Sequence, residues 1–334
     1  MKKKGILFLL TTSLILHPLF SQNPVTPSQE ELLFLHTISE FWKEGDWQIV
    51  KQKILSFLAL HPETSYRDNL EAILGDLYHE EGDFANAVAA YSTISAEPFV
   101  KQTLYRHLQS LSHIHAEEKA VILAEQILSS YEASTIPYYE EILFLLAKNS
   151  CYVMRDYSDI EIKRKWAAKA KSFYEKISNS FVQQSFLPLL AEIELNLGSY
   201  DLAYSYYTDL AKQYPEKEEE FLLEAAGAQL LFDKKGAIET YEKIYSLHKE
   251  KASFAAYNQF VLLLQERMYE ELIQKASSIY AHLTEEQKPS FNFWLAKSYF
   301  NLGHIREAGQ TFILFLAQNC PEKELTKAAL LHLL

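Results

Sequence analysis

The sequence predicts an all-α fold, built as an α-solenoid of about eight antiparallel helix pairs. Three observations lead to this prediction. Apolar residues recur at helical spacing, the pattern repeats about every 34 residues, and only 9 Gly and 10 Pro occur in 334 residues. So few turn-forming residues fit long helices joined by short connections better than an all-β fold. A repeat array also accommodates a long chain, because each unit packs only on its neighbours.

The chain opens with "MKKKGILFLLTTSLILHPLFSQ", which has the layout of a secretory signal peptide. Three lysines precede an apolar run, and Pro18 then interrupts it before Ser21. We predict a signal peptide over residues 1–21, a short linker over 22–30 and export to the periplasm. An uncleaved membrane anchor is the alternative, but the run is shorter than the roughly 20 residues that span a bilayer. No cysteine stands at the cleavage region to carry a lipid.

The charge of the chain excludes one class of partner. The net charge is −12, and removal of the leader takes away three lysines and no acid. Because phosphate backbones are bound by positive surfaces, nucleic acid is not expected as a partner. Cys151 and Cys320 stand far apart in a repeating chain, which favours two buried thiols over a disulfide. Stability is therefore expected to come from packing.

Each second helix of the array is predicted from apolar positions spaced i, i+4 and i+7, as on an amphipathic helix. Six of the seven spacings between the first positions lie close to 34, and the exception is the 50 residues from Ala120 to Ala170. The first positions hold Val50, Ala87, Ala120, Ala170, Ala203, Ala237, Leu272 and Ala308. The second hold Ile54, Tyr91, Ala124, Tyr174, Tyr207, Tyr241, Ala276 and Phe312, and the third hold Phe57, Ile94, Ile127, Ile177, Leu210, Ile244, Ile279 and Phe315.

The first helices and the turns follow the same period. A small residue stands twelve positions before the second-helix residue in four units, at Gly75, Ala191, Ala225 and Ala296. Paired small residues let two helix backbones approach closely. Glycines at the turns predict left-handed helix ends, and they are Gly82, Gly198 and Gly303. Prolines that separate one pair from the next are Pro62, Pro98, Pro215 and Pro321.

Three stretches carry a family resemblance. They are "LEAILGDLYHEEGDFANAVAAYSTI" at 70–94, "LPLLAEIELNLGSYDLAYSYYTDLAKQYP" at 187–215 and "FWLAKSYFNLGHIREAGQTFILF" at 293–315. The period, the small residues and the aromatic positions resemble the tetratricopeptide repeat. The resemblance covers residues 31–322 and implies a right-handed solenoid that binds proteins. Val50 and Leu272 depart from the usual alanine.

Two irregularities interrupt the array. The 50-residue spacing predicts an irregular joint near residues 131–165, with helices from about Pro137 to Met154 and from about Lys163 to Ile177. One array with a joint is our interpretation, and two sub-arrays are the alternative. The final segment, residues 323–334, reads as an apolar capping helix with Leu330, Leu331, Leu333 and Leu334. It either folds back on the last pair or docks on another subunit.

The residues that carry chemistry do not form a catalytic pattern. We find no glycine-rich phosphate loop, nucleophile elbow or zinc spacing in the sequence. His113 and His115 stand two residues apart, so a helix would point them to different faces. We therefore predict no enzyme, no cofactor and no metal site. A helical part of a cell-wall-processing enzyme or complex is the alternative.

The resemblance implies that first helices line a concave groove for a peptide or helix of a partner. Aromatic and cationic residues are typical anchors of such interfaces. The residues placed there by register are Tyr105, Arg106, Gln109, Phe144, Lys148, Tyr257, Asn258, Phe293, Trp294 and Lys297. A second candidate surface is a basic patch at Lys163, Arg164, Lys165 and Lys169, which could meet an acidic partner or anionic lipid headgroups.

These observations predict an exported protein-binding scaffold that works in assembly or maintenance of the cell envelope. Its partners are expected to be proteins. Contact with a membrane is expected only at the periphery, and oligomerisation through the C-terminal helix is left open.

Overall fold

The computed structural model describes residues 28–318 and 323–333, and all regular secondary structure in them is helical. The predicted signal peptide, most of the predicted linker, Cys320 and Pro321 lie outside the described residues. The chain divides between Gln183 and Gln184 into two compact units. This division lies beyond the joint predicted near residues 131–165.

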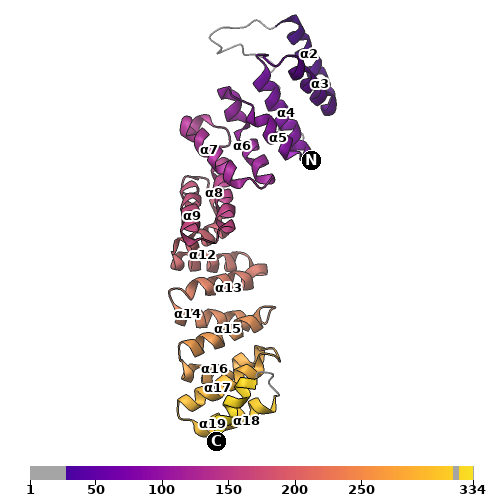
Figure 1. Ribbon diagram of the computed structural model, residues 1–334. Coiled ribbons are helices and arrows are strands. Elements are labelled where there is room, and N and C mark those ends of the chain that lie inside the picture. Colours follow the sequence, from indigo (N-terminus) through magenta and orange to yellow (C-terminus); the bar gives the residue numbers. More distant parts are fainter. Residues whose placement is uncertain (1–27, 319–322, 334) are drawn as a thin grey trace. The chain divides into compact units, whose positions relative to one another are not determined.

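Unit 1 contains four helix pairs in which each helix packs against the next (Figure 1). Among the first helices, α4 contacts α6 and α6 contacts α8, so the three form one face of the unit. A short 3₁₀ helix, η1 (Ala133–Thr135), precedes the fourth pair. The pairs are α2 (Gln29–Glu44) with α3 (Trp47–Leu60), α4 (Arg67–Glu81) with α5 (Phe84–Ser92), α6 (Glu97–His113) with α7 (Glu117–Ser130), and α8 (Tyr139–Asp156) with α9 (Ile160–Tyr174).

Unit 2 contains four further pairs and a last helix, α19 (Lys323–Leu333), which packs on α18. The short helix α10 (Ser180–Ser185) stands at the boundary, and η2 (Pro215–Lys217) precedes the second pair of this unit. The pairs are α11 (Leu187–Leu197) with α12 (Tyr200–Gln213), α13 (Glu218–Gln229) with α14 (Lys234–Ser246), α15 (Ala252–Gln265) with α16 (Tyr269–His282), and α17 (Lys288–Asn301) with α18 (Ile305–Ala317). The prediction of about eight helix pairs is confirmed.

Burial follows the predicted register. The residue at the first position of the i, i+4, i+7 stripe is at most 2% exposed in all eight second helices. Four residues further on, Ile54, Tyr207, Tyr241 and Phe312 are also buried. The small residues of the first helices lie in the core as expected, since Ala191, Ala225 and Ala296 are fully buried.

The fourth pair departs from the predicted register. In the other second helices the first stripe residue is the fourth residue of the helix, whereas in α9 that place is held by Lys163. Ala167 and Ala170 follow one and two turns later and are fully buried. The predicted second helix was wrong at both ends, because α9 spans Ile160–Tyr174 and Ile177 lies beyond it.

The extra residues of the fourth pair come before its turn. Helix α8 has 18 residues, and the segment with η1 lengthens the connection from α7. The turn from α8 to α9 takes only residues 157–159. The irregularity predicted around this turn therefore arises from a long first helix and a long entry to it.

Three predicted turn glycines adopt the left-handed conformation. Gly82, Gly198 and Gly303 have φ of 80°, 87° and 79°, at the point where a first helix ends. Gly45, which the sequence pattern did not single out, has φ of 82° and ends α2 in the same way. These glycines allow a sharp turn into the second helix at no steric cost, which sets the antiparallel pairing.

The close approach within the second pair is visible at Gly75. A Cβ built on Gly75 would lie 2.3 Å from Cε1 of Tyr91, so the tyrosine ring rests against the glycine backbone. The Tyr91 hydroxyl donates to Oδ1 of the neighbouring Asp76 at 2.7 Å. The sequence pattern paired Gly75 with Ala87, whereas the atoms nearest to a Cβ on Gly75 belong to Tyr91.

Candidate partner-binding site

A hollow in unit 2 brings together three of the predicted groove residues. Tyr257 from α15 and Trp294 and Lys297 from α17 line a cavity of about 430 Å³. Its volume lies in the range of ligand pockets, about 300–1,000 Å³. The other lining residues are Phe260, Val261, Leu264, Gln265, Tyr269, Ser290, Ser298 and Asn301. We call this set the unit 2 hollow.

The indole of Trp294 gives the unit 2 hollow an aromatic surface. Trp294 is 36% exposed, although such side chains usually lie largely buried. The Lys297 ammonium lies 5.2 Å from the centre of the indole ring, which is a cation–π contact. Lys297 is also the only charged residue among those that line the hollow. The arrangement suits an apolar side chain next to a negative charge.

Two other predicted groove residues of unit 2, Asn258 and Phe293, do not line the hollow. Asn258 is half-buried and donates from Nδ2 to the carbonyl oxygen of Phe254 at 2.7 Å. Phe293 is only 2% exposed and packs against Phe312 and Phe315 in the core. The prediction that Phe293 lines the groove was wrong, because the register of α17 turns Phe293 toward α18.

The predicted groove residues of unit 1 lie on the contacting helices α6 and α8. Tyr105, Gln109, Phe144 and Lys148 are half-buried there. The Tyr105 ring stacks on Tyr138, with ring centres 5.5 Å apart. Burial raises the pKa of the Tyr105 phenol, and the Glu141 carboxylate raises it further. Lys148 lies 5.6 Å from the ring centre of Tyr152.

Arg106, another predicted groove residue, forms ion pairs within the protein. Its Nη1 lies 2.7 Å from Oδ2 of Asp76, and its Nη2 lies 3.9 Å from Glu80. Asp76 is 5% exposed and also accepts the Tyr91 hydroxyl. The guanidinium thus compensates a buried carboxylate, so most of its charge serves the packing of α4 against α6.

The predicted basic patch lies on α9. Arg164 pairs with Glu161 at 3.0 Å. Lys169 pairs with Glu125 at 2.9 Å, and its ammonium lies 5.0 Å from the Trp166 ring centre. Lys163 is half-buried and Lys165 is exposed. Two of the four cations are therefore neutralised by neighbouring acids, which reduces the positive charge offered to a partner.

The C-terminal helix α19 packs with one face on the last pair. Ala329 is fully buried, and the His332 ring stacks on Phe312 with centres 5.2 Å apart. Leu330 and Leu331 are 51% and 71% exposed on the remaining surface. The helix thus folds back on α18 and still leaves leucines in solvent.

Most residues of the unit 2 hollow were not among the predicted groove residues. Val261 and Leu264 follow Tyr257 at i+4 and i+7, and Asn301 follows Trp294 at i+7. The helical periodicity that identified the second helices would have found them on the first helices. Tyr269 begins the second helix α16, a position the register did not assign to the groove.

Two further properties concern the described residues only. They contain no group of three or more His, Cys, Asp or Glu side chains placed to hold a metal ion. None of their helices combines the length and the apolar character that a membrane crossing requires.

Comparison with known proteins identifies the repeat. Residues 189–217, which include most of α11 and all of α12, match the family model of the tetratricopeptide repeat. None of the curated proteins matches the sequence.

Solved structures with a similar course of the chain include two at 13% sequence identity. One is a tetratricopeptide repeat protein from Parabacteroides merdae ATCC 43184, with a TM-score of 0.40 over 92% of this chain and 100% of that chain. The other is Naa15/Naa10 bound to HypK-THB, with a TM-score of 0.41 over 90% of this chain and 56% of that chain. Residues 189–217 therefore form a tetratricopeptide repeat, and the other helix pairs of the two units repeat its helix–turn–helix arrangement.

Proposed function

We propose that the chain is an exported scaffold that binds a segment of a partner protein in the unit 2 hollow, and that it serves assembly or maintenance of the cell envelope. The observation that carries the binding site is Trp294, which lines the cavity, is partly exposed and makes a cation–π contact with Lys297. Export is supported by the leader-like residues 1–21.

The side chains that line the unit 2 hollow determine which kind of partner segment can bind there. Its walls are largely apolar and aromatic, so burial of one large apolar side chain of the partner would supply most of the binding free energy. Lys297 adds one positive charge, which favours an acidic residue a turn away in the partner. Packed helix pairs are rigid, so the scaffold loses little conformational entropy on binding.

The test uses a library of random peptides displayed on phage and selected on the full chain. We expect selected sequences to combine an aromatic or large aliphatic residue with an acidic one. Trp294→Ala should weaken their binding by about 2 kcal/mol or more, as removal of an interface hot spot does. Lys297→Gln should weaken acidic peptides more than their amide analogues.

A matched control separates the hollow from the rest of the surface. Phe254 is 57% exposed on the same helix as Tyr257 but does not line the hollow. Phe254→Ala should leave peptide affinity unchanged. Equal losses for Phe254→Ala and Trp294→Ala, with unchanged helicity, would reject the unit 2 hollow as the binding site.

A further inference from the structure

The second helix of the second pair is short, and this opens a cavity in unit 1. Helix α5 has 9 residues, whereas the other second helices have 13 to 15. The chain leaves the helix after Ser92, and Asp68 then accepts the backbone N–H of Ser95 at 3.0 Å. Ile94, at the third stripe position, therefore lies outside the helix and is half-buried, whereas Leu210 and Ile244 are buried.

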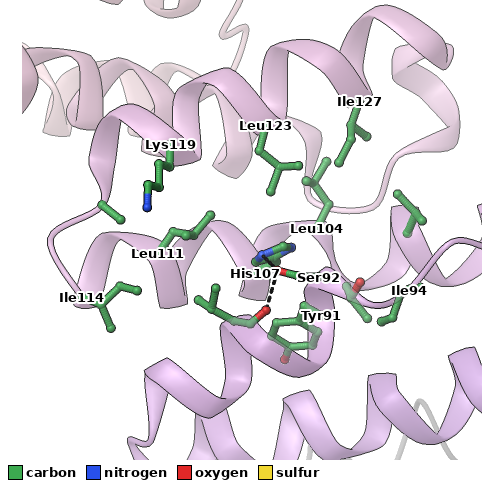
Figure 2. A pocket seen from close by; sticks show the side chains of 14 residues that line it. Tyr91, Ser92, Ile94, Leu104, His107, Leu111, Ile114, Lys119, Leu123 and Ile127 are labelled. Atoms are coloured by element: carbon green, nitrogen blue, oxygen red, sulfur yellow. Dashed lines mark hydrogen bonds between the residues drawn. The ribbon is translucent and has the colours of Figure 1, made fainter.

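The resulting cavity of about 440 Å³ lies between α5, α6 and α7. Figure 2 shows side chains of all three helices around it, with Leu123 and Ile127 from α7 opposite Tyr91 and Ser92 from α5. We call it the α5–α7 cleft. Most of its lining is apolar and includes Tyr91, Ile94, Leu104, Leu111, Leu123 and Ile127. This volume is that of a pocket for a small molecule.

The polar groups on the floor of the cleft are uncharged at neutral pH. His107 is 8% exposed, and burial lowers the pKa of its imidazole to about 4. Its Nε2 lies 3.5 Å from the Ser92 hydroxyl, which itself donates to the carbonyl oxygen of Val88 at 2.6 Å. The Thr103 hydroxyl donates to the carbonyl oxygen of Phe99.

One positive charge stands at this otherwise neutral cleft. Lys119 is the only lining residue that is charged at neutral pH, and its side chain is exposed. Within the described part of the chain, no carboxylate lies within ion-pair distance of its ammonium. In Figure 2 the side chain extends from α7 toward Leu111 on α6. In a chain of net charge −12, an uncompensated cation at an apolar cavity selects for an anionic group.

We propose that the α5–α7 cleft binds a small amphiphilic monocarboxylate, with its apolar chain between α5 and α7 and its carboxylate on Lys119. The size of the cavity favours a free small molecule over a folded partner. The site is separate from the unit 2 hollow, since all its lining residues belong to unit 1. A failure of the proposed peptide binding would therefore leave the proposal for the α5–α7 cleft unaffected.

The test is isothermal titration of the full chain with decanoate and with decanol, each below the concentration at which it aggregates. We expect one decanoate to bind per chain. Lys119→Gln should weaken decanoate about two- to fivefold, as loss of an exposed ion pair does, and leave decanol unchanged. Ser92→Phe places a ring in the cleft and should weaken both ligands at least about tenfold, because the chain of the ligand no longer fits.

Two variants serve as controls, and circular dichroism confirms that each variant is folded. Lys53 is an exposed lysine of α3 away from the cleft, so Lys53→Gln should leave decanoate affinity unchanged. Trp294→Ala should also leave it unchanged, since it alters only the unit 2 hollow. Absence of binding, insensitivity to Ser92→Phe, or equal losses with Lys53→Gln or Trp294→Ala would overturn the proposal. Tighter binding of a short peptide with one leucine and one aspartate than of decanoate would also overturn the proposal.

Discussion

Replacement of Gly75 by alanine tests the close contact between the helices of the second pair. The added Cβ would lie 2.3, 2.5 and 2.8 Å from Cε1, Cδ1 and Cζ of Tyr91. The ring cannot move away at no cost, because it is 3% exposed and its hydroxyl is held by Asp76 at 2.7 Å. Gly75→Ala should therefore destabilise the protein.

Two opposing effects set the magnitude. Alanine is favoured over glycine inside a helix by about 1 kcal/mol. Overpacking of a well-filled core costs about 1–3 kcal/mol, and disturbance of the Tyr91–Asp76 hydrogen bond adds about 1 kcal/mol. The net loss in free energy of unfolding should be about 1–3 kcal/mol.

Gly227 provides the matched control. It lies inside α13, and a Cβ built on it meets no atom within 4 Å. Gly227→Ala should therefore raise the free energy of unfolding by about 0.5–1 kcal/mol through helix propensity alone. The same substitution thus has opposite signs at two helical positions of one protein.

The assay is unfolding in guanidinium chloride, followed by circular dichroism. Because the chain has two units, unit 1 is followed separately by tryptophan fluorescence in a Trp294→Phe background, which leaves Trp42, Trp47 and Trp166, and Gly227→Ala in unit 2 is followed by circular dichroism. In a Tyr91→Leu background, Gly75→Ala should lose most of its cost. Equal stabilisation by Gly75→Ala and Gly227→Ala would refute the close contact.

Three further predictions follow from buried polar groups and from a turn. Arg106→Met leaves Asp76 without its guanidinium and should cost about 3 kcal/mol in chemical unfolding, with no measurable loss if the ion pair is only a surface contact. His107 has its pKa lowered to about 4, so the unfolded chain binds its proton first as the pH falls. Stability should then fall by about 2 kcal/mol from pH 8 to pH 5, and His107→Gln, unlike exposed His115→Gln, should remove this part of the pH dependence, which leaves the contribution of His79, whose pKa is also lowered by burial. Gly198→Ala forces alanine to φ of 87° and should lower the free energy of unfolding by about 1 kcal/mol, whereas a higher unfolding midpoint would contradict the left-handed turn.

The pairing of helices could be predicted because alanine recurs near the start of most second helices. Ala87, Ala203 and Ala308 fix both the period and the buried face, and a periodicity of 3.6 residues then places the rest. The fourth pair could not be placed this way. In α9 two alanines, Ala167 and Ala170, lie on the same face, and spacing alone does not tell which one begins the stripe.

The candidate site was harder to predict than the fold. Trp294 and Phe293 are neighbours in sequence and both are aromatic, but a helix turns them in different directions by about 100°. The structure places one at the hollow and the other in the core. The α5–α7 cleft depends on how early α5 ends, and helix ends follow from local contacts such as that of Asp68 with Ser95, which the pattern of apolar residues does not encode.

The most direct test of the proposed scaffold is photo-crosslinking in the native cell, with benzoylphenylalanine placed in turn at Asn258, Lys297 and Glu239. Lys297 lines the unit 2 hollow, Asn258 follows the lining residue Tyr257 in α15, and Glu239 is exposed on the second helix α14. We expect positions 258 and 297 to crosslink the same partner protein and position 239 to give no crosslink to it. Crosslinks to that partner from position 239, with none from positions 258 and 297, would refute binding at the unit 2 hollow.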